Sequence, residues 1–184
     1  MFNMQASHKR KVRKTSRMQT FRLAIILALA AVGLLAACAP AASTPTQLAD
    51  REVSLYYYNP DLDLDDSGNI LCSPAGLVAV ERSLDPSLSG EALIEQTIEL
   101  LIAGELTADE RAEGITTEFP LEGLSLDHVT SDGSMLTLTF SDPNLQTSGG
   151  ACRVGILWAQ IEATAQQFPD LTEVRFAPEE LFQP

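Results

Sequence analysis

Beyond residue 22 the chain contains no lysine, and its cations there are five arginines. All 25 aspartates and glutamates lie in the same part of the chain, so residues 38–184 carry a formal charge of 5 − 25 = −20. Such a surface repels nucleic acid and anionic lipid headgroups, and it attracts cations or basic partners. The sequence therefore argues against nucleic acid as a partner, and the simplest role of the charge is solubility.

Histidine is almost as scarce, because His128 is the single histidine after residue 8. A zinc site needs three or four histidine or cysteine ligands, and His128, Cys72 and Cys152 show no ligand spacing. A Ser-His-Asp triad would have to use His128, but no Gly-x-Ser-x-Gly turn presents a nucleophile. We therefore predict no enzyme activity, no catalytic residue and no cofactor. An envelope hydrolase that uses two of the many carboxylates stays open as the alternative.

The first 37 residues differ in character from the rest of the chain. Residues 1–22 hold seven cations and no acid, and an apolar run from Leu23 to Ala37 follows. As a helix, this run would span about 22 Å, which is short of the roughly 30 Å hydrocarbon core of a bilayer. The pattern favours a secretory signal peptide over a permanent transmembrane anchor.

The apolar run ends in Leu35-Ala36-Ala37-Cys38, which resembles the lipobox cut by lipoprotein signal peptidase. In that motif the cysteine carries a diacylglycerol on its sulfur. The resemblance implies a signal peptide over residues 1–37, lipidation of Cys38, and an extracytoplasmic protein anchored to a cell membrane. Two acyl chains suffice for stable anchoring. The alternative is an ordinary signal peptide that has a cysteine near its end.

Composition divides the mature chain into three parts. Residues 38–50 are small, polar and proline-bearing, which is typical of a flexible tether. Residues 51–178 form the predicted domain, and residues 179–184 a C-terminal tail. Export places Cys72 and Cys152 in an oxidising compartment, where a pair of cysteines favours a disulfide. Two buried free thiols are the alternative.

Periodicity and turn residues predict seven elements in the domain. The expected strands and extended segments are 53–58, 70–84, 124–130, 135–141 and 171–177, and the expected helices are 90–103 and 150–168. Asp132-Gly133 between two alternating runs is a strong hairpin signal. The order β-β-α-β-β-α-β predicts a single α+β domain, with two helices packed on one face of a mixed sheet.

An acidic loop precedes the second strand and partly matches a calcium loop. Asp63, Asp65 and Ser67 supply oxygens at positions 1, 3 and 5, and Gly68 takes position 6. Position 12, which requires a bidentate glutamate, is Pro74. The pattern makes these three residues weak calcium candidates, and a solvated acidic hairpin loop is the simpler interpretation.

Several segments in order resemble the GerMN domain, which is named for a sporulation and spore-germination lipoprotein. They are Leu55–Tyr58, Val80–Arg82, the helix 92–104 ending Leu-Leu-Ile-Ala-Gly, Gly114–Pro120, the hairpin, and Thr164–Pro169 before Val174–Phe176. The chain departs from the family in its long acidic loop, its two cysteines and Ala-Gly-Glu where Gly-Pro is usual.

The resemblance implies a non-catalytic, ring-building-motif-like envelope module, held to the membrane by its lipid, that binds another envelope protein or a cell-wall polymer. A sheet covered by helices on one side would leave a strand edge free for docking. Tyr56 and Tyr58 are candidate aromatic anchors, unless they merely complete the core. An envelope hydrolase and a calcium-responsive adhesion or solute-binding lipoprotein are the competing functions.

Overall fold

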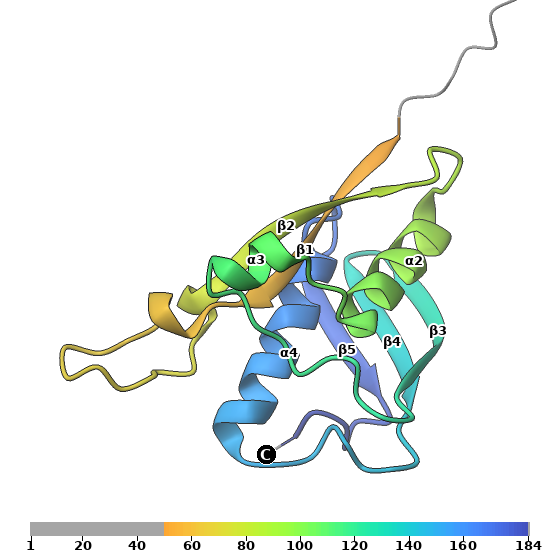
Figure 1. Cartoon of the computed structure of the whole chain (residues 1–184). Coiled ribbons are helices and arrows are strands. Elements are labelled where there is room, and N and C mark those ends of the chain that lie inside the picture. The colour runs from red at the N-terminus through yellow and green to blue at the C-terminus, as the bar shows by residue number, and fades with distance from the viewer. Residues whose placement is uncertain (1–49, 184) are drawn as a thin grey trace, which may run out of the picture. The chain divides into compact units, whose positions relative to one another are not determined.

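Strands β1 (Arg51–Tyr58) and β2 (Leu77–Leu84) form an antiparallel two-stranded sheet in the computed structural model, which describes residues 50–183 (Figure 1). Val53, Leu55 and Tyr57 of β1 are buried, as the alternation of apolar residues predicts. The second expected strand is shorter than predicted. Residues 70–76 lead into it as a loop and a short 3-10 helix, η2 (Pro74–Gly76).

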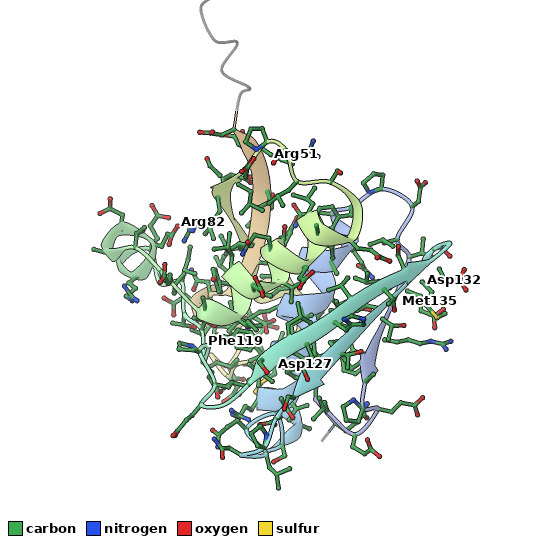
Figure 2. The ribbon with its side chains drawn as sticks, turned by 90° about the vertical axis from the view of Figure 1, so that its right-hand side faces the viewer. Arg51, Arg82, Phe119, Asp127, Asp132 and Met135 are labelled. Carbon is green, nitrogen blue, oxygen red and sulfur yellow. A yellow bond between two sulfur atoms is a disulfide. The ribbon has the colours of Figure 1, made fainter. Side chains whose placement is uncertain are left out.

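The second sheet contains β3 (Ser125–Asp132), β4 (Met135–Ser141) and β5 (Glu173–Ala177). Strand β4 lies in the centre, antiparallel to β3 and parallel to β5. The tight turn between β3 and β4 has Gly133 at φ +61°, a conformation that glycine adopts at little cost, and Figure 2 shows Asp132 and Met135 beside it. The predicted hairpin is confirmed, and side chains along β4 alternate between buried and half-buried.

Two long helices match the predicted ones closely. Helix α2 (Gly90–Ala103) ends at Gly104, which has φ +66°, and α4 (Ala151–Gln166) ends before Pro169. A Cβ atom at Gly104 would lie 2.0 Å from the carbonyl oxygen of Phe119. Both the backbone conformation and the close approach therefore require glycine at this position.

The α+β class is confirmed, but the prediction of one mixed sheet is wrong: the described residues form two sheets. The cause lies at the edge of β1 that faces away from β2. Two side chains occupy that edge. Gln167, just after α4, hydrogen-bonds to the backbone of Ser54, and Thr164, within α4, hydrogen-bonds to the backbone of Tyr56. The helices are also not confined to one face of one sheet, since α2 contacts β1 and β3, and α4 contacts β1 and β5.

A short helix, α3 (Ala108–Ala112), lies between the first predicted helix and the strand predicted from residue 124, where the sequence analysis places no element. Thr107 and Glu110 form a capping box at its start. Glu110 also accepts two hydrogen bonds from the guanidinium of Arg82 at 2.7 and 2.9 Å, which joins α3 to β2. The sequence signal for this helix was therefore the Thr-x-x-Glu motif.

The C-terminal residues belong to the core. Leu181 and Phe182 are buried, although the sequence suggests a tail over residues 179–184. The ring of Phe182 lies 4.9 Å from that of Phe176 and 5.6 Å from that of Phe140. These contacts extend the apolar layer of the three-stranded sheet beyond the end of β5.

Candidate functional site

The segment from Pro60 to Ser73, hereafter the 60–73 loop, projects from the end of the β1–β2 sheet (the yellow loop in Figure 1). Within it the chain folds back on itself as a narrow hairpin. Leu64 and Ile70 form an antiparallel bridge, the Leu71 N–H donates to the Asp63 carbonyl, and the Asp65 N–H donates to the Asn69 carbonyl. The loop therefore has a defined backbone of its own.

The carboxylate of Asp63 fixes the base of this loop. It is 1% exposed and accepts hydrogen bonds of 2.6 Å from the Tyr58 hydroxyl, the Ser73 hydroxyl and the Ser73 backbone N–H. These hydrogen bonds, chiefly the one from the Ser73 hydroxyl, hold the pKa of Asp63 below its usual value. Burial, together with Asp63, raises the pKa of Tyr58 to about 12. Both groups keep their roles as acceptor and donor at neutral pH.

A disulfide also fixes the base of the loop. Cys72 is bonded to Cys152 at the start of α4, with the Cα atoms 5.2 Å apart. That separation lies within the roughly 4.4–6.8 Å range expected for a disulfide. Cys72 has φ +56°, so the chain turns sharply where it leaves the loop.

The tip of the loop is held by Asp65. Its Oδ1 accepts hydrogen bonds from the backbone N–H groups of Ser67 and Asn69, each at 2.8 Å, and its Oδ2 accepts one from the Asn69 side chain. The 60–73 loop is therefore ordered by internal hydrogen bonds at its tip as well as at its base.

Large apolar side chains are exposed along this ordered loop. Leu62 is 59% exposed, Leu64 44%, Ile70 50% and Leu71 57%. In the described residues a fifth large apolar side chain, Leu145, is exposed elsewhere. The sequence analysis does not predict this feature, although the sequence contains a signal for it. The acidic segment fits neither a helix nor a core strand, yet it contains four large apolar residues: Leu62, Leu64, Ile70 and Leu71.

The calcium candidates Asp63, Asp65 and Ser67 are not brought together as a metal site. The buried carboxylate of Asp63 accepts hydrogen bonds from Tyr58 and Ser73 at the base of the loop. The carboxylate of Asp65 instead accepts a hydrogen bond from Asn69 at the tip, and Ser67 is exposed. Hydrogen bonds from the protein thus already use the carboxylate oxygens that calcium would need. Within residues 50–183 no group of three histidine, cysteine or acidic side chains is placed to hold a metal ion.

The structure places the other predicted residues as follows. His128 is exposed on β3, with its Nδ1 3.2 Å from the Asp127 carbonyl oxygen. Tyr58 is buried against Asp63, which agrees with the alternative that it completes the core, and Tyr56 is half-buried. Cys38, with the rest of the signal peptide and lipobox, lies outside the described residues. None of the helices described is both long and apolar enough to cross a membrane.

Among the open grooves on the described domain are two that each contain one carboxylate. One, of about 640 Å³, runs beside β5 and contains Trp158 and Glu179. The other, of about 230 Å³, contains Tyr58, Glu118 and Gln160. Among the described residues, neither lining includes His128, a cysteine or a second carboxylate, so neither presents an acid–base pair.

Comparison with known proteins identifies the family. Among the solved structures that match are the tandem GerMN domains of the sporulation protein GerM from Bacillus subtilis (18% identity, TM-score 0.46, covering 77% of this chain). Another is a protein from Clostridium perfringens described as a candidate lipoprotein (18% identity, TM-score 0.37, covering 69% of this chain and 73% of that one). This chain spans 44% of the GerM structure. Among curated proteins none matches. The family model described as "Germane: Sporulation and spore germination" matches residues 54–179, which is more than half of the chain. The chain therefore belongs to the Germane family.

Proposed function

We propose that this chain is a non-catalytic lipoprotein of the cell envelope, held at the outer face of a membrane by a lipid on Cys38, whose Germane domain binds another envelope protein. The observation that supports binding most directly is the 60–73 loop. Exposed apolar side chains on an ordered backbone are typical of interaction sites, and they carry a solvation cost that a purely structural loop does not need.

The roles of the ionisable side chains support the non-catalytic part of the proposal. The carboxylates with lowered pKa values include Asp63, Asp85, Glu110 and Asp142, and each accepts hydrogen bonds from neighbouring residues. A general acid or nucleophile needs a perturbed group that faces a substrate. These carboxylates instead stabilise loops and a helix start.

Metabolic labelling tests the lipid anchor. Cells that express the full chain are grown with labelled palmitate, and Cys38→Ser is compared with the wild type and with Ser43→Ala in the tether. The wild type and Ser43→Ala should incorporate label and fractionate with membranes, whereas Cys38→Ser should do neither. Unchanged labelling of Cys38→Ser would overturn the lipoprotein assignment.

Chemical cross-linking in those cells tests the binding function. The membrane-anchored wild type should form a discrete adduct with a second protein, and the adduct should weaken when Cys38→Ser prevents anchoring. The same preparation should leave peptidoglycan and a model ester unhydrolysed. Hydrolysis that one point substitution abolishes would instead identify an enzyme.

A further inference from the structure

We propose that the 60–73 loop is the docking element of this domain, and that its partner is a protein with an apolar recess bordered by arginine or lysine. This inference rests on the proposed function and deepens it, because it assigns the binding surface and the chemistry of the partner. It is carried by the exposure, the rigidity and the charge of the loop.

The apolar side chains of the loop are exposed on the surface of the domain. Leu64 and Ile70 are bridge partners on the two sides of the hairpin, so their side chains lie next to each other on one face. They are 44% and 50% exposed, and Leu62 and Leu71 nearby are more exposed still. A loop needs no such side chains for solubility, and burying them in a partner would remove a substantial apolar area from water.

The backbone of the loop is held in place at both its base and its tip. Asp63, Ser73 and the Cys72–Cys152 disulfide hold the base, and Asp65 holds the tip. Docking therefore requires little ordering of the backbone, and the entropic cost of ordering a flexible loop on binding is largely avoided. This is the arrangement expected of a docking element, since its shape is already set before the partner arrives.

Charge determines what kind of partner fits. Asp61 and Asp66 are exposed beside the apolar side chains, Asp65 is half-exposed, and no cation occurs between residues 60 and 73. Desolvating these carboxylates against an uncharged surface would be unfavourable, so a complementary surface carries cations around its apolar centre. Such a partner would also be attracted by the net negative charge of the whole domain.

The same features argue against two other occupants of this surface, a lipid bilayer and a second copy of this chain. A bilayer with anionic headgroups would repel the aspartates. The loop also lies at the far end of β1 from Arg51, where the chain enters the domain. Because eight residues of strand span roughly 26 Å, the loop lies about that far from the end of the domain that the proposed lipid anchor precedes. A second copy of this chain would bring together two acidic loops, and like charges oppose that contact.

Photo-cross-linking in cells identifies the occupant. Leu62→benzoylphenylalanine places a photoreactive group on the loop of the full chain, and Leu145→benzoylphenylalanine is the matched control on another exposed leucine. The loop reporter should give a discrete protein adduct, and the partner peptide, mapped by mass spectrometry, should be apolar with arginine or lysine nearby. An adduct to phospholipid, an adduct to a second copy, or no adduct would each overturn the inference.

Substitutions in the reporter chain test the two interactions separately. Leu64→Ser with Ile70→Ser should lower the adduct yield by about tenfold or more, as expected when apolar anchors are lost. Asp61→Asn with Asp66→Asn should lower it severalfold at low salt and less at high salt. Leu145→Ser and Asp127→Asn, at exposed positions elsewhere, should have no effect. Thermal unfolding and intact disulfide mass confirm that each variant is folded.

The result also separates this inference from the proposed function. If adducts to an envelope protein form from reporters at Arg175 or Trp158 while the loop reporter gives none, the domain still binds a protein and only the assignment of the loop is wrong. If every position fails and Cys38→Ser keeps its label, the proposed function itself is wrong.

Discussion

The side-chain amide of Gln167 binds both polar groups of the Ser54 backbone. Its Oε1 accepts a hydrogen bond from the Ser54 N–H at 2.8 Å, and its Nε2 donates one to the Ser54 carbonyl at 2.7 Å. Thr164 accepts a third hydrogen bond from the Tyr56 N–H. An amide side chain thus takes the place of a neighbouring strand, and the β1 edge that would otherwise be open to another chain is closed.

Replacing this amide should open the edge. Gln167→Ala leaves the Ser54 N–H and carbonyl without their partners in a half-buried position, so we expect a loss of about 1–3 kcal/mol in the free energy of unfolding. Denaturant unfolding measures the loss, and light scattering should detect faster aggregation. The neighbouring Gln166→Ala, at an exposed position, should stay within about 0.5 kcal/mol of the wild type. Equal stability of the two variants would show that the edge contact is unimportant.

The ion pair between Arg82 and Glu110 should make stability depend on acid. The Arg82 guanidinium lowers the pKa of Glu110 to about 2, and 4.5 is its ordinary value. A lowered folded-state pKa means that this stabilisation is present above about pH 4.5 and is lost as the pH falls towards 2. Glu110→Gln should therefore cost about 2 kcal/mol at pH 7, since the hydrogen bonds to a charged group are weakened.

Chemical denaturation at a series of pH values checks this expectation. The difference in unfolding free energy between the wild type and Glu110→Gln should shrink between pH 4.5 and 2. Glu113→Gln, an exposed glutamate next to α3, is the control and should show no such trend. A constant difference down to pH 2 would contradict the assignment of the pKa shift to this pair.

The Cys72–Cys152 disulfide should contribute strongly to stability. It joins residues 80 positions apart, and closing a loop of that length stabilises by about 3–5 kcal/mol in the chain-entropy model. Cys72→Ser with Cys152→Ser should unfold at a lower denaturant concentration, and reductant should affect only the wild type. Mass spectrometry of non-reduced peptides should find the two cysteines linked. Unlinked peptides in protein prepared without reductant would rule the bond out.

The sequence predicts elements whose signals are local. Helix α2 has the predicted bounds: its apolar residues recur with helical periodicity, and Gly104 directly follows its last residue. The β3–β4 hairpin follows from Asp132-Gly133 between alternating runs. Helix α3 has five residues, too few for an apolar period, and only the capping motif at Thr107 marked it.

Features that depend on distant residues could not be predicted in this way. The prediction of a single sheet is wrong because the Gln167 side chain hydrogen-bonds to the edge of β1 at Ser54. These residues are 113 positions apart, and no pattern near either of them indicates the contact. The loop aspartates suggest solvent or calcium, yet Asp63 is buried because two side chains hydrogen-bond to it: Tyr58, which precedes the motif, and Ser73, which is no calcium-ligand position in it. The apolar residues of the candidate binding surface can be read in the sequence, but the exposure of their side chains depends on the fold of the whole loop.

The C-terminal segment should prove essential for folding. Phe182 is 1% exposed, and its ring packs against Phe140 and Phe176, so truncating it leaves a cavity in the core beside the three-stranded sheet. Phe182→Ala should cost about 3–5 kcal/mol in unfolding free energy, measured with denaturant, and Phe182→Leu should cost less because it fills part of the space. Gln183→Ala, at the exposed next position, is the matched control and should be neutral. Since the ring closes the core from outside the strands, a Phe182→Ala protein as stable as the Gln183→Ala control would mean that residues after β5 are a tail and not part of the fold.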